Sequence, residues 1–434
     1  MSDLWPLGLM RARAGESLPE VERVRPTSFE EVRALLRSGR RVVPAGGGSG
    51  VCGAVRAEPG DVVLDLGGLD GVEIDEADLL VRAQAGVNGM ELERRLNQRG
   101  LTLGHFPSSL PVATVGGLVS TRSSGQESTR HGSVEDMLLG LTVALPDGSL
   151  AEARAVPRSA AGPALHHLFC GAEGGLGVIL EAVLRVHRQP EAVIGRGWRL
   201  DGVDAGLEAC REAMQRALRP LVMRLYDPED SMLQGEAQGC LLVAAAAGPR
   251  PVAQAEAEVL ASVVEAAGGE PLGEQPWERW LRHRFDLSAE RLRDLLEPSG
   301  SYLDTIEVAA TWAGLPPLYR AVKGRLAGTA QLVLCHFSHA SAQGACAYFT
   351  FAGSAPDEAA AEAAYRAAWR GAMEATLASG ATISHHHGVG RVRAPWIRAE
   401  MKGWFPVWEA VRRALDPDGR MNPGAVGGSG GSAA

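Results

Sequence analysis

The chain has 434 residues, of which 45% are hydrophobic and 22% charged, a globular composition that excludes intrinsic disorder and allows two or three domains. Its formal net charge of −9 argues against nucleic-acid partners, because sequence-independent binding needs a basic surface. Glycine is in excess, at 54 residues or about 12%, against a usual level of about 7%. Only two lysines are present, Lys323 and Lys402, and neither follows a glycine cluster, which excludes a lysine-bearing phosphate loop.

The six cysteines are scattered and form no C-x-x-C pair, so we expect them to be reduced and mostly buried. The N-terminus lacks the pattern of a signal peptide. The longest apolar run, near Cys240 to Ala247, is too short to span a bilayer. We therefore expect a cytoplasmic protein, and leave open both a peripheral contact with a membrane surface and a homodimer.

The first half of the chain is predicted to contain short strands, helices and glycine loops. A helix capped by Thr27 or Ser28 stops at Gly39, and a strand over 41–43 leads into a loop. The next predicted elements are a strand over 62–66, a hairpin over 72–83, a helix from Asn88 to Gly100, and strands over 139–145 and 178–186. Residues 107–125, rich in Gly, Ser and Thr, are predicted to be too polar for a core element.

Beyond about His187 the chain is predicted to alternate longer helices with apolar strands. The predicted helices are 207–217, 252–267, 357–377 and 404–415, and the predicted strands are 221–225, 240–247, 331–337 and 345–351. The last two strands flank a short connection, which favours a hairpin.

Three glycine clusters lie in the first half, at 46–48, 116–117 and 174–177. Glycine allows positive φ and a close approach of the backbone, which leaves successive N–H groups free to converge on an anion. A single loop of this kind would be interpreted as a tight turn, and none has the G-x-G-x-x-G spacing of a Rossmann fold. Three such loops in one domain favour an extended ligand that carries phosphate.

Five motifs in order, PAGGGSG, DLGGLDGV, AQAGVNGMELERRL, LGHFPSSLPVATVGGLVST and GAEGGLGVI, resemble the FAD-binding domain of the vanillyl-alcohol oxidase / p-cresol methylhydroxylase superfamily. The resemblance implies an α+β fold with a two-part FAD-binding domain over 21–189. It also implies a substrate (cap) domain over 190–426, with an antiparallel sheet covered by helices and a C-terminal segment that returns to the flavin. Residues 1–20 and 427–434 are expected to be tails.

The resemblance also implies which residues hold FAD. The glycine loop would bind the pyrophosphate, and the later segments would contact the flavin and ribityl groups. The implied residues are Pro44, Ala45, Gly46, Gly47, Gly48, Ser49, Gly50, Pro107, Ser108, Ser109, Leu110, Ala113, Thr114, Gly116, Gly117, Ser120, Thr121, Arg122, Ser123, Glu173, Gly174, Gly177, Val178 and Ile179. The glycine loop contains no histidine for covalent attachment, so FAD is expected to bind non-covalently. His131, in TRHGSVED, has no assigned role.

His385, His386 and His387 form the most unusual short feature of the sequence. Adjacent residues on an extended chain point to opposite faces, and no Cys, Asp or Glu lies nearby in the sequence, so no metal site is predicted. Imidazole exchanges protons near neutral pH, which favours acid–base chemistry. A purely structural role stays open for at least one of the three.

The segments SHHHGVGRVRAPW, GACAYFTF, VMRLYD and RDLLEPSGSYLDTIEVAATW resemble those of the alkyldihydroxyacetonephosphate synthases, a subfamily of the same flavoproteins. The implied site residues are Tyr348 and His387 for proton handling, His385 and His386 as their assistants, and Arg293 and Arg224 for the substrate phosphate or carboxylate. Residues of these types also occur as core tyrosines or surface arginines. The chain departs from the subfamily where His336 replaces an arginine of a strand.

This resemblance implies exchange of the acyl group of acyl-dihydroxyacetone phosphate for a fatty alcohol, a step of ether lipid synthesis. In that subfamily the flavin carries the substrate covalently, so there is no net redox change. The alternative is an FAD-linked oxidase or dehydrogenase of a 2-hydroxy acid or alcohol, with hydride transfer to flavin N5. Such dehydrogenases usually show Glu-His-Gly at this loop, where this chain has His386-His387-Gly388. A flavin fold without catalysis is disfavoured by the tyrosine, histidine and arginine set.

Overall fold

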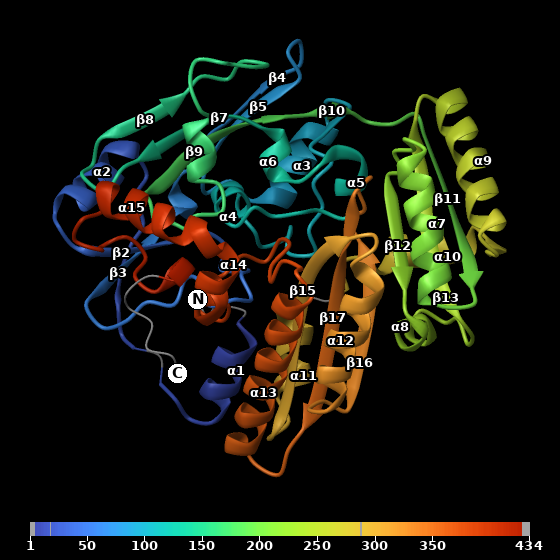
Figure 1. Cartoon of the computed structure of the whole chain (residues 1–434). Coiled ribbons are helices and arrows are strands. Elements are labelled where there is room, and N and C mark those ends of the chain that lie inside the picture. The colour runs from blue at the N-terminus through green and yellow to red at the C-terminus, as the bar shows by residue number, and fades with distance from the viewer. Residues whose placement is uncertain (1–4, 18, 287–288, 428–434) are drawn as a thin grey trace.

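The computed structural model describes residues 5–17, 19–286 and 289–427 and shows the α+β architecture in two parts (Figure 1). The helices are α1 (Pro6–Arg13), α2 (Phe29–Arg37), α3 (Gly89–Asn97), α4 (Val115–Ser120), α5 (Ser128–His131), α6 (Val134–Met137), α7 (Val203–Gln215), α8 (Pro228–Leu233), α9 (Arg250–Ala266), α10 (Gln275–His283), α11 (Ala289–Leu296), α12 (Leu315–Ala327), α13 (Glu358–Ala378), α14 (Ile397–Met401) and α15 (Phe405–Leu415). The strands are β1 (Glu22–Val24), β2 (Arg41–Ala45), β3 (Asp61–Asp65), β4 (Val72–Asp75), β5 (Leu80–Gln84), β6 (Leu101–Thr102), β7 (Leu138–Ala144), β8 (Leu150–Ala153), β9 (Val178–Arg185), β10 (His187–Arg188), β11 (Ala192–Leu200), β12 (Val222–Tyr226), β13 (Cys240–Gly248), β14 (Glu270–Gly273), β15 (Ser301–Thr311), β16 (Leu332–Ser338) and β17 (Gly344–Ser354).

The first part holds a small parallel sheet, in the order β1-β3-β2, and a five-stranded antiparallel sheet, in the order β4-β5-β9-β7-β8. The predicted helix after residue 28 is confirmed as α2, whose first turn is capped by the Ser28 side chain accepting from the Glu31 N–H. The hairpin predicted over 72–83 is confirmed as β4 and β5, and Asn88 caps α3 as expected.

The prediction for residues 107–125 is wrong, because α4 lies in the core. Val115, Leu118 and Val119 of this helix are buried in the first hydrophobic core. Gly116 permits the packing, since a Cβ there would lie 2.7 Å from the Cβ of Ala85. A glycine-rich composition therefore marked a helix that approaches its neighbour closely, and not a polar loop.

The second part is built on one seven-stranded antiparallel sheet, in the order β14-β11-β13-β12-β16-β17-β15. Side chains alternate between its faces. One face, which includes Cys335, Phe349 and Ile306, packs against α7, α9, α12 and α13 in a second core. The predicted hairpin is confirmed as β16 and β17, but β11, β14 and β15 were not expected.

The other face of this sheet carries a row of polar and aromatic side chains. Glu307 of β15 pairs with Tyr348 of β17, which pairs with His336 of β16, which pairs with Tyr226 of β12. The four residues are in register across adjacent strands and therefore point to the same side. This face looks toward the first part of the molecule (Figure 1).

Residues 6–13 do not form a tail, although the sequence analysis placed them in one. They fold as α1, and Trp5, Leu7 and Met10 are buried in the core of the second part. The Arg13 guanidinium also donates to the carboxylate of Glu358 on α13 at 2.6 Å. Residues 5–13 therefore pack on the second part, although they precede the first part in the sequence.

The C-terminal segment runs back to the first part, beside the glycine loop. Met421 pairs with Val42 of β2 in a parallel bridge, and the Asn422 N–H donates to the Val42 carbonyl at 2.8 Å. Of the expected tail, residues 428–434 lie outside the described residues.

The burial of Trp5 predicts a large loss of stability on truncation. Its side chain is 7% exposed and packs on the backbone of Gly53, so Trp5→Ala should lower the free energy of unfolding by about 3–5 kcal/mol. Trp404→Ala, at a side chain that is 75% exposed, should change it by about 0.5 kcal/mol or less. Urea denaturation of both FAD-loaded variants measures the difference, and equal losses would contradict the placement of α1.

Candidate active site

A cavity of about 630 Å³ lies between the two parts and is lined by residues of both. At one end the loop after β2 meets the segment that precedes α4. A Cβ at Gly47 would lie 1.8 Å from the Val112 carbonyl oxygen, and one at Gly46 would lie 2.2 Å from the Thr114 hydroxyl. Only glycine allows this approach, so the backbone of the loop forms the wall of the cavity.

Most of the residues predicted to hold FAD line this cavity. They are Pro44, Ala45, Gly46, Gly47, Gly48, Ser49, Gly50, Pro107, Ser108, Ser109, Ala113, Thr114, Gly116, Gly117, Ser120, Thr121, Ser123, Glu173, Gly174, Gly177 and Ile179. Leu110 and Val178 are outside the lining and point into the core. Arg122 is also outside it, and its side chain pairs with Glu135 at 3.0 Å on the surface.

The other end of the cavity is lined by Tyr226, His336 and Tyr348 of the polar row and by part of the segment 384–390, which we call the histidine loop. Arg224, Tyr348, His386 and His387 all line it, as the sequence analysis expected. His385 is outside the lining and contacts His386 instead.

Arg293 does not join the site, contrary to the sequence analysis. It lies on α11 with its side chain exposed, whereas Leu292, the residue before it, is buried and lines the cavity. Neighbouring residues of a helix point about 100° apart, so a motif match does not fix which of them faces the substrate.

Tyr348 lies at the centre of the polar row. Its ring stacks on His336 at 4.7 Å between centroids and meets the edge of His387 at 5.4 Å. Burial raises the pKa of the Tyr348 hydroxyl above its ordinary value, so the group is a phenol at neutral pH. It is therefore available as a proton donor.

Glu307 fixes the backbone of the histidine loop. One oxygen of its buried carboxylate accepts the backbone N–H groups of His386 and His387, at 3.1 and 2.6 Å, and the Ser384 hydroxyl at 3.0 Å. Burial alone would raise the pKa of Glu307, but the charge of Arg393 and the donors of the loop outweigh burial and lower it. The carboxylate thus stays charged.

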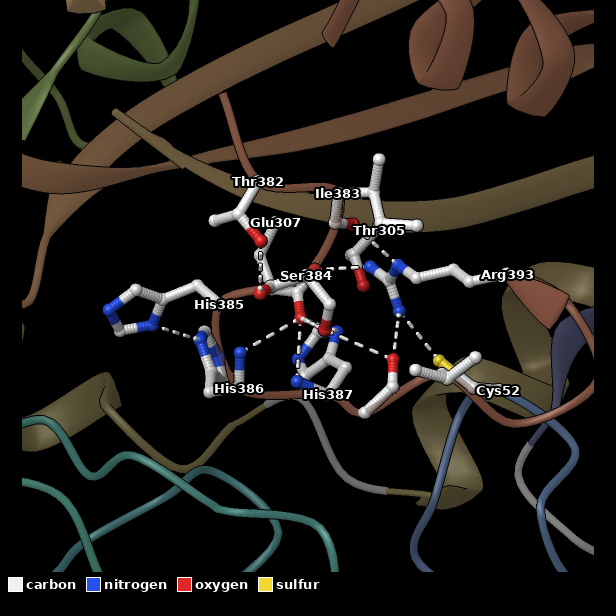
Figure 2. Close-up of polar contacts among 12 residues, drawn as sticks. Cys52, Thr305, Glu307, Thr382, Ile383, Ser384, His385, His386, His387 and Arg393 are labelled. Carbon is white, nitrogen blue, oxygen red and sulfur yellow. Dashed lines mark hydrogen bonds and ion pairs between the residues drawn. The ribbon is translucent and has the colours of Figure 1, made fainter. Parts of the chain in front are cut away.

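Arg393 is the residue that connects these groups, and its side chain is fully buried (Figure 2). Its guanidinium donates to the second oxygen of Glu307, to the carbonyls of Ile383 and Gly388, and to the Cys52 sulfur at 2.8 Å. It joins β15, the histidine loop and the glycine-loop region of the first part. The sequence analysis missed both Arg393 and Glu307.

Glu173 also holds the histidine loop, although the sequence analysis assigned it to FAD. Its carboxyl group accepts the Val389 N–H at 2.9 Å and the Gly390 N–H at 2.8 Å. Burial raises the pKa of Glu173 to about 7, against the opposing effect of these donors. A Cβ at Gly388 would lie 2.2 Å from a Glu173 oxygen, which explains the glycine after the histidines.

His387 is held as a neutral base. Burial lowers its pKa to about 4, although Glu307 opposes this shift. Its Nδ1 is buried and has no hydrogen-bond partner among the described residues, because the nearest Glu307 oxygen is 3.9 Å away. A neutral imidazole with a free nitrogen, beside the phenol of Tyr348, forms a proton acceptor and a proton donor in one place.

His385 and His386 lie in a more crowded cluster. Their Nδ1 atoms are 3.0 Å apart, and both rings contact His339. The sequence analysis found no further metal ligand nearby, but the fold brings the buried thiol of Cys346 to within 4.8 Å of both histidines. Burial raises the pKa of this thiol well above its ordinary value. The absence of a metal stays a prediction.

The remaining histidine of unknown role, His131, is not part of the cavity lining. Its ring lies against that of His187, 4.3 Å away between centroids and tilted by 38°, and burial lowers the pKa of His131 to about 3. All six cysteines are free and buried, as expected. No helix of the described residues is long and apolar enough to cross a membrane.

Two family models match the chain and together cover most of it. The model of the FAD binding domain matches residues 22–154, and the model of the FAD linked oxidases, C-terminal domain, matches residues 189–426. The second match alone spans more than half of the chain. The chain belongs to the FAD-linked oxidase family.

Similar proteins agree with this assignment. The alkyldihydroxyacetonephosphate synthase of Dictyostelium discoideum is 30% identical, over 96% of this chain and 74% of its own. The uncharacterized FAD-linked oxidoreductase YgcU of Escherichia coli (strain K12) is 32% identical, over 84% and 79%. A solved alkyldihydroxyacetonephosphate synthase superimposes with a TM-score of 0.78 at 25% identity, over 94% and 78% of the two chains. At 15% identity, p-cresol methylhydroxylase shares the fold with a TM-score of 0.76, over 94% and 88%.

This FAD-linked oxidase is an FAD-dependent enzyme, and its cavity fits the cofactor. The glycine loop lines the cavity with backbone and without side chains at Gly46 and Gly47. A pyrophosphate can therefore approach the backbone N–H groups closely. The side-chain amide oxygen of Gln126, a residue of the cavity lining, is buried without a partner among the described residues, as expected of a group that faces a ligand. Ser49 lines the cavity whereas the Cys52 sulfur faces Arg393. Non-covalent attachment stays a prediction.

Because the Arg393–Glu307 ion pair is buried, we predict that the stability of the protein depends on it. Arg393→Met leaves a buried carboxylate without its counter-charge and should destabilise the protein by about 3–5 kcal/mol. Arg398→Met, whose side chain is 71% exposed and 3.8 Å from Glu409, should cost about 0–1 kcal/mol. Chemical denaturation of the FAD-loaded proteins compares them. A loss for Arg393→Met no larger than for Arg398→Met would contradict the role given to Arg393.

Proposed function

We propose that this FAD enzyme exchanges the acyl group of an acyl-dihydroxyacetone phosphate for a fatty alcohol. The proposal agrees with the similarity to proteins named alkyldihydroxyacetonephosphate synthase. One observation carries the proposal: the rings of Tyr348 and His387 meet edge to face, 5.4 Å apart between centroids, and both residues line the cavity that contains the glycine loop. Bound FAD would supply an electron acceptor at this position. The chain itself supplies the proton transfers.

In this reaction His387 would accept the proton that leaves the substrate carbon and return it to that carbon after the exchange. Tyr348 would protonate the departing carboxylate and regain a proton from the hydroxyl of the incoming alcohol. Arg224 would bind the headgroup of the substrate at the far end of the polar row. The fatty chains would pack against the apolar side chains of the cavity lining, among them Leu233 and Trp280.

A second candidate is an FAD-linked dehydrogenase or oxidase of a 2-hydroxy acid or alcohol. It is favoured by the exposed position of Arg293, because Arg224 is then left as the lining arginine for the substrate: Arg284, the other arginine of the described lining, is paired with Glu127 at 3.2 Å. One arginine is sufficient for a carboxylate. His387 would act as the base in this reaction too, and the hydride would pass to the flavin.

A mixing experiment distinguishes the two reactions. The FAD-loaded protein is mixed anaerobically with acyl-dihydroxyacetone phosphate and a fatty alcohol, and separately with D-lactate, glycolate and simple alcohols. The exchange reaction predicts an alkyl product and released fatty acid, with no lasting loss of the yellow colour. Bleaching by a hydroxy acid or alcohol, without alkyl product, would support the dehydrogenase and reject the exchange.

Substitution of the proton donor and acceptor predicts a loss of turnover with FAD retained. Tyr348→Phe and His387→Ala should each lower kcat by about 100-fold or more, because each removes a general acid or base. Tyr302→Phe, on the same sheet but bonded to the Thr329 carbonyl, and His167→Ala, on the surface, should keep their activity. Flavin absorbance verifies loading. Normal turnover in Tyr348→Phe or His387→Ala would disprove the assigned roles.

A further inference from the structure

The substrate end of the cavity contains an arginine with donors to spare. Arg224 lines the cavity, and its Nε is buried without a partner among the described residues. Its Nη2 lies 2.8 Å from Nε2 of His336 and 3.3 Å from Nδ1. Nδ1 also lies 3.5 Å from the carboxylate of Asp230. Arginine can only donate and a carboxylate can only accept, so the tautomer that suits both neighbours accepts at Nε2 and carries its hydrogen on Nδ1.

The charges at this end are balanced before any substrate enters. The positive charge of Arg224 is matched by Asp230, which is 7% exposed and also lines the cavity. Arg284 is the other cation of the described lining, and it is paired with Glu127 at 3.2 Å. An anion that binds Arg224 therefore meets a neutral region, and needs one more positive charge to be held well.

We propose that His336 takes up a proton when an oxyanion headgroup, phosphate or carboxylate, binds Arg224. The anion replaces Nε2 of His336 as the acceptor on Arg224. One proton from solvent then goes to Nε2, so that His336 and Arg224 both donate to the anion while Asp230 anchors Nδ1–H. No covalent bond to the anion forms or breaks. The inference rests on the proposed function only in requiring an anionic substrate.

The surroundings of His336 permit this change. The titratable groups that face it are Arg224 and Tyr226 from β12, Asp230 from α8, Tyr348 from β17 and His339 from the loop after β16. Burial keeps the two tyrosines and His339 neutral, because it raises the tyrosine pKa values and lowers that of His339. Lys323 and Tyr319 of α12 bond to Asp227 and contribute to the opposite face of the sheet.

The direction of the pH dependence follows from these contacts. In the free protein, burial and the charge of Arg224 lower the pKa of His336 to about 4, although Asp230 opposes them. A bound anion adds a negative charge, which raises this pKa. Between the free and the bound pKa the complex holds one more proton than the free protein, so anion affinity increases as the pH falls.

Calorimetry of the FAD-loaded protein tests the inference without turnover. Sulfate and 2-hydroxy-2-methylpropanoate, a hydroxy acid with no α-hydrogen to transfer, are titrated between about pH 5.5 and 8 in buffers that differ in ionisation enthalpy, since neither anion titrates there. We expect uptake of up to about one proton per anion, and an affinity that falls by up to about tenfold for each unit by which the pH rises. Sulfate serves as the dianion probe and the hydroxy acid as the carboxylate probe, so the two titrations separate the headgroup classes.

Two variants and a control make the result specific to His336. His336→Gln should bind anions without proton uptake, and His336→Arg should bind sulfate more tightly with little dependence on pH. His283→Gln, at an exposed histidine of the cavity lining, should keep the uptake of the wild type. Absence of saturable binding, binding without proton uptake, or unchanged uptake in His336→Gln would each overturn the inference. Loss of the exchange reaction with uptake retained would reject only the proposed function.

Discussion

The ion pair between Arg393 and Glu307 is the interaction on which the site depends. Both side chains are fully buried, and a buried charge is tolerated only when its partner and its hydrogen bonds are complete. Glu307 meets this condition with three donors from the histidine loop besides Arg393. Arg393 meets it with two carbonyls and the sulfur of Cys52. The position of His387 relative to the first part of the molecule is thus fixed by groups that cannot move independently.

The large sheet explains how proton handling and anion binding come to lie in one line. Antiparallel pairing places Glu307, Tyr348, His336 and Tyr226 side by side, and the pleat points them all toward the flavin-binding part. The opposite face is apolar and packs against helices. A polar row in a buried sheet is stable here because its members satisfy one another or face the cavity. Tyr348 stacks on His336 in the middle of the row, between Glu307 and Tyr226.

The sequence predicted what local pattern determines and missed what depends on long-range pairing. Apolar alternation was sufficient for the hairpin of β16 and β17, and cap residues were sufficient for α2 and α3. Glu307 and Arg393 are 86 residues apart, and nothing local distinguishes one arginine among many as a buried one. Arg293 is the opposite case. The motif match pointed to the correct helix, but Leu292 faces the cavity and Arg293 is exposed. The family and its cofactor were therefore predictable from motifs, whereas the direction in which a single side chain points was not.

The acid–base pair and the anion end make different demands on the substrate. Tyr348 and His387 are both neutral, so a proton can be taken up and returned in one place for either exchange or oxidation. In our proposal, the two candidate reactions share this step and differ in the headgroup that the other end of the cavity binds. There Arg224 contacts His336, whose Nδ1 lies 3.5 Å from Asp230, so an anion would be recognised by a group of fixed charge and a group that can gain charge. On this proposal the choice of substrate depends on Arg224 and His336, whereas Tyr348 and His387 would serve either reaction.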